Sequence, residues 1–176
     1  MEKNIDKIKN GIPNLFTFGN LIFGTMSLIM TFDENYRMAG IFIIVSALLD
    51  RYDGRIARIL NVSSEIGKEL DSLADLISFG VAPSMLIYNM YNFSDTGLWG
   101  YFLLLIFPVA GAYRLARYNV ASFDGVFSGI PITIAGILLA LYSLSSNFLV
   151  SNRVITYIIV LLLSYLMVSK IEFKKV

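Results

Sequence analysis

Long apolar stretches separated by short polar segments recur along the whole chain. Each stretch holds about 20 largely apolar residues, enough for a helix to cross a bilayer core of roughly 30 Å. The pattern predicts six helices, over residues 14–32, 37–60, 67–91, 97–120, 130–148 and 152–170. We therefore expect an all-α integral membrane protein with six transmembrane helices, in which residues 1–176 form a single membrane domain.

Basic residues gather on one side of the expected membrane. Six spans return the chain to its starting side, so both termini and the connection after the second span lie together. Of the fourteen Lys and Arg, Arg37 and Arg153 fall opposite, which leaves twelve on the side of the termini. Lys and Arg accumulate in cytoplasmic loops. We expect a multi-pass protein of the cell (plasma) membrane with both termini in the cytoplasm.

Composition excludes several kinds of site. The chain has no Cys and no His, so any metal ion must be held by oxygen ligands. A net charge of +1, without a long basic block, argues against nucleic acid as a partner. The partners that we expect are membrane lipid and small molecules. Residues 1–10 are charged and lack a cleavage site after a short apolar stretch, so we expect no removable signal peptide.

Four aspartates lie in or beside the second and third apolar stretches. Asp50 and Asp53 are three residues apart and Asp71 and Asp75 are four apart, so each pair shares one helix face. The short connection makes the two helices antiparallel neighbours, and the acidic faces can meet near the cytoplasmic surface. Clustered acids repel one another and are costly in a membrane, so a cation should occupy the pocket. Such ligands suit Mg²⁺, Mn²⁺ or Ca²⁺, and a pair of ions can clamp the oxygens of a phosphoryl transfer.

Small residues accompany the acids. Gly54 and Ala57 share the helical stripe of the first acidic pair, and Gly67 lies one turn before Asp71. Small residues also allow close helix packing, which is the alternative interpretation. Beside four acids, they favour a slot for a nucleotide.

The full pattern is Asp50-x2-Asp53-Gly54-x2-Ala57-Arg58-x8-Gly67-x3-Asp71-x3-Asp75, which resembles the signature of the CDP-alcohol phosphotransferases at every fixed position. The resemblance implies an enzyme that transfers a phosphorylated group from a CDP-activated lipid to an alcohol and releases CMP. It also implies two divalent cations, Mg²⁺ or Mn²⁺, and a homodimer.

The same resemblance implies a role for each site residue. One cation would be bound by Asp50, Asp53 and Asp71, and the second by Asp50, Asp71 and Asp75. Asp75 would also act as the general base. Contacts to the CDP part of the donor would come from Gly54, Ala57, Arg58, Ser64, and from Asn14 and Thr17 on the first helix.

Two further segments bear on the acceptor. Both resemble the serine-using branch of the same family, and they read Arg114-Leu-Ala-Arg117-Tyr-Asn119 and Ser128-Gly129-Ile-Pro131. Arg114 and Arg117 lie three residues apart, where they could bind the carboxylate of L-serine. Snorkelling cytoplasmic cations are the alternative interpretation. The implied reaction is transfer of a phosphatidyl group, or an archaetidyl group with ether-linked tails, to the serine hydroxyl.

Two other functions stay open. Glycerol 3-phosphate or an inositol phosphate would need Arg as much as serine does, which leaves the acceptor open within the family. A divalent-cation transporter would use the four acids as a permeation site. The acids cluster at the cytoplasmic boundary with Arg58 beside them, which disfavours transport.

Overall fold

The computed structural model describes residues 2–60, 64–120, 126–145 and 152–174. These residues form α1 (Glu2–Phe32), α2 (Tyr36–Leu60), α3 (Glu65–Asp75), the π-helical segment η1 (Leu76–Val81), α4 (Ala82–Met90), the 3-10 segment η2 (Phe93–Thr96), α5 (Leu98–Val120), α6 (Ile132–Ser145) and α7 (Arg153–Val168). All six predicted helices are present, because α3, η1 and α4 together make the third. The first begins at Glu2, twelve residues before the predicted start at 14. Residues 146–148 of the fifth lie outside the described residues.

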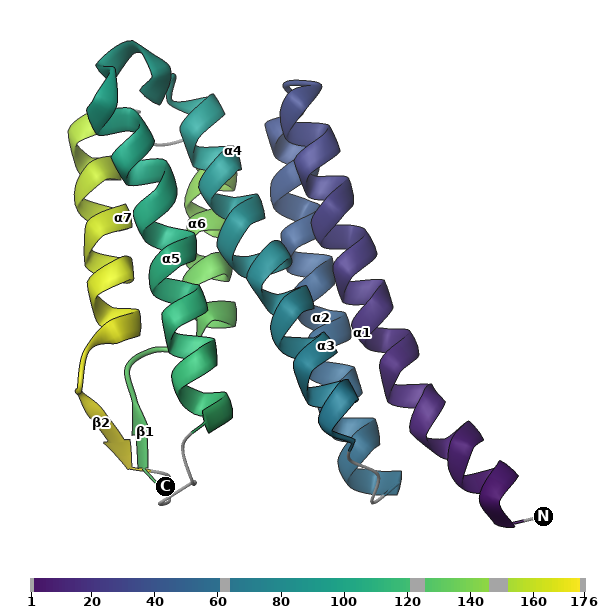
Figure 1. Ribbon diagram of the computed structural model, residues 1–176. Helices are drawn as coiled ribbons and strands as arrows, with labels where there is room; N and C mark the ends of the chain where they lie inside the picture. The colour runs from purple at the N-terminus through teal and green to yellow at the C-terminus, as the bar shows by residue number, and fades with distance from the viewer. Residues whose placement is uncertain (1, 61–63, 121–125, 146–151, 175–176) are drawn as a thin grey trace.

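The helices stand side by side in one bundle (Figure 1). α1 packs along α2 and α3, α5 packs along α7, and α6 contacts both α2 and α4. The start of α1, the end of α2 and the start of α3 lie at one end of the bundle, and η2 lies at the other (Figure 1). The acid-bearing helix ends are therefore at the same end as the two chain ends.

Within the described ranges, three helices are long and apolar enough to cross a membrane: Asn14–Phe32, Glu65–Met90 and Leu98–Val120. Two shorter apolar helices follow, Ile132–Ser145 and Arg153–Val168. The charges from Asp50 to Arg55 interrupt the apolar stretch of α2. Together these helices describe a multi-pass membrane protein.

In helix α1 polar side chains are buried and apolar ones are exposed, the reverse of a helix in a soluble protein. Its buried side chains include the polar Asn20, Ser27 and Thr31, while Leu15 and Ile22 are exposed. Apolar side chains face lipid and polar ones find partners between helices. The buried face of α1 is therefore where polar chemistry can be held.

A local widening follows the acids of the third helix. In η1 the N–H of Ala82 donates to Ile77 O, a π-helical bond, and the next residue is Pro83, which has no N–H to donate. Phe79 of η1 packs against Gly136 of α6, where an added Cβ would lie 2.7 Å from the Phe79 carbonyl oxygen. The widened turn thus lies in close contact with α6.

A small antiparallel sheet was not predicted. β1 (Val126–Ser128) pairs with β2 (Glu172–Lys174), with Phe127 opposite Phe173. Gly129 follows β1 with a φ of +74°, and an added Cβ would lie 2.5 Å from Met167 O. Only glycine combines that φ with so close an approach. Three-residue strands leave no alternating pattern in the sequence, so an expectation of helices alone missed this pairing.

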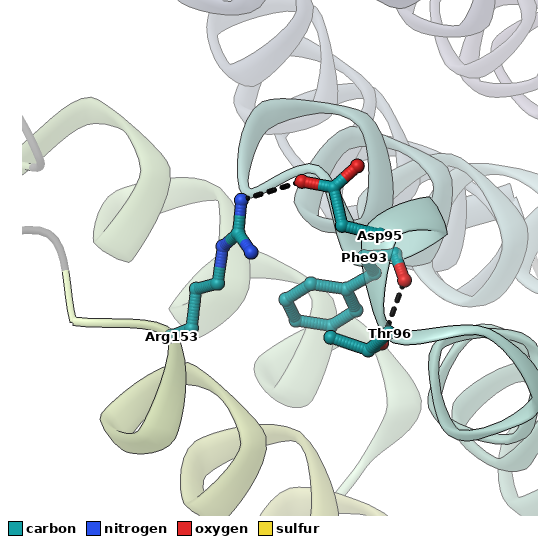
Figure 2. Close-up of polar contacts among 4 residues, drawn as sticks. All are labelled: Phe93, Asp95, Thr96 and Arg153. Carbon is teal, nitrogen blue, oxygen red and sulfur yellow. Dashed lines mark hydrogen bonds and ion pairs between the residues drawn. The ribbon is translucent and has the colours of Figure 1, made fainter.

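The opposite end of the bundle is tied by η2. Arg153 Nη2 lies 2.8 Å from Asp95 Oδ2, and Thr96 Oγ1 donates to Phe93 O at 2.7 Å (Figure 2). The Phe93 ring is buried and meets Tyr157 edge-on, with ring centroids 4.8 Å apart. These contacts join the turn before α5 to the start of α7.

Candidate active site

Three of the four aspartates converge between α2 and α3. One carboxylate oxygen each from Asp50, Asp53 and Asp71 lies within 4.8 Å of the others. Asp53 is buried, and the other two are partly buried. Asp75, one turn further along α3 than Asp71, is only 8% exposed. The spacing within each helix and the packing of both α2 and α3 along α1 produce this cluster.

The donor set fits a hard divalent cation. Asp71 Oδ1 is buried and has no hydrogen-bond partner among the described residues. Within the same part of the chain, none of the four acids forms a salt bridge with Lys or Arg. Buried oxygen atoms without partners are rare, and carboxylates are the ligands that Mg²⁺ and Mn²⁺ prefer. The arrangement can therefore bind a metal ion.

Helix α1 supplies hydrogen bonds to the acids. Thr17 Oγ1 donates to Asp53 Oδ2 at 3.0 Å, and Asn20 Nδ2 donates to Asp75 Oδ1 at 3.1 Å. Both donors are buried. Thr17 was among the residues predicted from the sequence, and Asn20 was not. Its signal was present, because Asn14, Thr17 and Asn20 recur every third residue in an otherwise apolar stretch and so share one helix face.

Three predicted nucleotide contacts meet at the start of α3. Ser64 is the N-cap of α3 and accepts from the Gly67 N–H at 2.9 Å. An added Cβ on Gly67 would lie 2.9 Å from Ser64 Oγ and 3.2 Å from Asn14 Oδ1. The structure thus brings Asn14, Ser64 and Gly67 together, and one role of Ser64 is to satisfy a free N–H at the helix start.

The remaining predicted nucleotide contacts lie on α2. Gly54 is exposed, and nothing lies within 4 Å of an added Cβ, so the space beside the acids is open there. Arg58 is exposed, and its Nε donates to Gly54 O at 2.8 Å. Ala57 lies on the same helix, and its side chain is outside the described residues.

The two arginines of α5 have different surroundings. Arg114 is buried, and its Cζ lies 4.7 Å from the centre of the Tyr118 ring. Its Nε has no hydrogen-bond partner in the described part of the chain. Arg117 is partly buried, and its Nη1 reaches Val168 O at the end of α7 at 3.4 Å. Of these two arginines, Arg114 is the one whose side chain is buried inside the bundle.

The end of α5 is joined to α3 by Asn119. Its side-chain Nδ2 donates to Ser72 Oγ at 3.0 Å and to Glu69 Oε1 at 3.3 Å. Its backbone carbonyl oxygen accepts from Lys68 Nζ at 3.3 Å. These bonds hold the helix of Arg114 beside the helix of Asp71 and Asp75.

Known proteins resemble this chain over most of its length. The family described as CDP-alcohol phosphatidyltransferase matches residues 10–169, which include every site residue above. The CDP-diacylglycerol–serine O-phosphatidyltransferase of Helicobacter pylori is 42% identical over 176 residues, covering 93% of this chain and 73% of the relative. The protein of that name from Bacillus subtilis is 39% identical, with 93% and 90% covered. The archaetidylserine synthase of Methanothermobacter thermautotrophicus is 32% identical, with 94% and 70% covered.

Proposed function

The chain belongs to the CDP-alcohol phosphatidyltransferase family, and from this membership we propose that it transfers the phosphatidyl or archaetidyl group of a CDP-activated lipid to the hydroxyl of L-serine and releases CMP. The observation that carries the chemistry is the convergence of three carboxylates within 4.8 Å, with Asp75 one helical turn beyond Asp71. The choice of serine is supported by the names of the relatives from bacteria and an archaeon.

Two divalent cations, Mg²⁺ or Mn²⁺, are the proposed cofactors. Asp50, Asp53 and Asp71 would hold one, and Asp50, Asp71 and Asp75 would hold the second. When bound, such ions neutralise the pyrophosphate and stabilise the attacking and leaving oxygens of a phosphoryl transfer. The orphan oxygen of Asp71 supports a cation at this place.

Asp75 is the proposed general base. Its Oδ1 accepts from Asn20, and its Oδ2 is the oxygen that we propose takes the proton of the serine hydroxyl. As that proton leaves, a bond forms between the serine oxygen and the lipid-linked phosphorus. The bond from this phosphorus to the oxygen of CMP breaks, and CMP departs with the electron pair.

The donor and the acceptor would approach from different helices. Gly54 leaves open space, and Arg58 can offer guanidinium N–H groups to a phosphate. Asn14, Thr17, Ser64, Gly67 and Ala57 complete the proposed CDP site. Arg114, buried and with its Nε unpartnered among the described residues, would bind the serine carboxylate, and Arg117 would assist from the same helix.

The proposed setting is the cell membrane, with one membrane domain of six spans. Both termini and the site would face the cytoplasm, as supported by the twelve basic residues expected on that side. The protein would act as a homodimer, which is inferred from the family resemblance alone.

The direct test uses the chain purified in detergent with CDP-diacylglycerol and Mn²⁺ or Mg²⁺. We expect CMP release that depends on L-serine and that Asp75→Asn lowers to a small residual rate. Release that instead requires glycerol 3-phosphate or an inositol phosphate would keep the chemistry and reject serine. If no alcohol releases CMP and the chain carries Mn²⁺ into liposomes, a cation transporter replaces the proposal.

A further inference from the structure

Asn20 lies where three helical segments meet. It is fully buried, and its amide Nδ2 donates to Asp75 Oδ1 at 3.1 Å. Its backbone carbonyl oxygen accepts from Ser46 Oγ at 3.1 Å and from Ser78 Oγ at 3.0 Å. Ser46 precedes Asp50 by four residues on α2, and Ser78 follows Asp75 by three in η1. One residue of α1 thus connects both acid-bearing segments.

The orientation of the Asn20 amide follows from hydrogen-bond chemistry. An ionised carboxylate only accepts hydrogen bonds, so the amide nitrogen must face Asp75. Asn20 Oδ1 then points elsewhere, and it is buried without a partner in the described part of the chain. Burying an amide with one end unsatisfied costs stability, a cost that an apolar side chain of the same size would not have.

The approach of Ser78 to Asn20 requires a small neighbour. Gly24 lies one turn beyond Asn20 on α1, and an added Cβ there would overlap Ser78 Oγ and lie 2.8 Å from Ser78 Cα. Absence of a side chain at Gly24 therefore allows η1 to sit against α1. The two serine hydroxyls bond the backbone carbonyl of Asn20 and so fix the position from which its side chain extends to Asp75.

We propose that Asn20 is a positioning residue for Asp75: it holds Oδ1, stops the carboxylate from turning about χ2, and leaves Oδ2 directed to the reacting hydroxyl. The terminal torsion of Asp is broad and two-fold, so an unheld carboxylate samples many orientations. This inference rests on the proposed function for the identity of the reaction, but the geometry of the Asn20–Asp75 pair stands without it.

The test compares Asn20→Leu, which keeps the side-chain size and removes the donor, with Ser27→Ala as a matched control. Ser27 lies two turns later on α1, is fully buried, and its Oγ has no partner among the described residues. We expect Asn20→Leu to lower kcat for CMP release about 10–100-fold, the range found when a partner of a metal-site ligand is lost. KM for both substrates should stay within about twofold of the parent, and Ser27→Ala should keep the parental kcat.

A double-mutant comparison separates positioning from packing. In the Asp75→Asn background, Asn20→Leu should change the residual rate by less than about twofold, because the group on which it acts is already lost. An equal loss in both backgrounds, or a parental kcat for Asn20→Leu, would overturn the proposal. If Asn20→Leu does not fold, Asn20→Ser replaces it, since its hydroxyl is too short to keep the bond to Asp75.

Failure of the proposed function has a different signature. If the parent uses another alcohol, the same comparison is made with that alcohol. If no alcohol releases CMP, Mn²⁺ binding is measured by electron paramagnetic resonance without substrates. Asn20→Leu should then weaken Mn²⁺ binding about tenfold or more, with no change for Ser27→Ala. Unchanged binding in that case would overturn the role of Asn20 independently of the reaction.

Discussion

Thr17 on α1 donates a hydrogen bond of 3.0 Å from its Oγ1 to Oδ2 of Asp53 on α2. The family resemblance implied a contact between Thr17 and the CDP donor, and the structure shows that its hydroxyl also orients a carboxylate. Ligating carboxylates are commonly held by such bonds, and losing one costs about 10–100-fold in metal affinity or activity. The first helix is thus part of the acidic site without contributing an acid.

Thr17→Val removes this donor at nearly constant volume. We expect the activity and the Mn²⁺ affinity to fall about 10–100-fold, and Thr17→Ser to recover most of both. The matched control is Thr25→Val, because among the described residues Thr25 Oγ1 bonds within its own helix, to Leu21 O at 2.8 Å. Parental Mn²⁺ affinity in Thr17→Val would show that the bond does not support the metal site.

Asp71→Asn tests the charge balance of the site. Like charges within 4.8 Å destabilise the protein without metal, so in EDTA the variant should unfold about 2–4 °C above the parent, an effect of roughly 1 kcal/mol. Saturating Mn²⁺ should stabilise the parent, by about 2.7 kcal/mol at one hundred times its Kd, and leave the variant unchanged. Thermal unfolding in detergent measures both, and an equal Mn²⁺ shift in the two proteins would contradict metal binding at Asp71.

Gly54→Ala tests the proposed nucleotide slot. Nothing lies within 4 Å of the added Cβ, and Ala is favoured over Gly inside a helix, so the unfolding temperature should rise by about 2–4 °C. If the CDP group occupies that space, KM for the CDP-lipid should rise while KM for serine stays constant. Gly136→Ala is the contrasting variant, because its Cβ would lie 2.7 Å from Phe79 O, and it should destabilise the protein by about 1–3 kcal/mol. An unchanged KM in Gly54→Ala would reject a slot at this position.

The contacts in Figure 2 should differ greatly in energy. The side chains of Arg153 and Asp95 are 45% and 58% exposed, and exposed ion pairs contribute about 0.2–1 kcal/mol. Arg153→Gln should therefore lower the unfolding temperature by only about 1–3 °C. Phe93→Ala removes a ring that is 1% exposed and should cost about 3–5 kcal/mol. A larger loss in Arg153→Gln than in Phe93→Ala would reverse this ranking.

The proposed topology can be tested by cysteine labelling, since the chain has no Cys of its own. Ser94 and Glu65 are both exposed and lie at opposite ends of the bundle. A membrane-impermeant maleimide should label Ser94→Cys in intact cells, and Glu65→Cys only after the membrane is opened. The reverse pattern would place the acids outside the cell.

The sequence by itself determined the helices and the acidic cluster, because both depend on short-range spacing. Apolar stretches of membrane-spanning length define the helices. Asp50 and Asp53, and likewise Asp71 and Asp75, share a face through the helical repeat. Carboxylates from both helices meet as predicted, while α2 and α3 are held together through their packing on α1.

Tertiary structure alone decided which other residues support these acids. Asn20 reaches Asp75 across 55 positions of sequence and Ser78 across 58, and Arg114 is buried while Arg117 reaches the end of α7. Residues three apart on one helix look alike in sequence, and their partners depend on how neighbouring helices are rotated and how closely they approach. The physical reason is that packing between helices, through contacts such as Gly24 with Ser78, sets those rotations and distances.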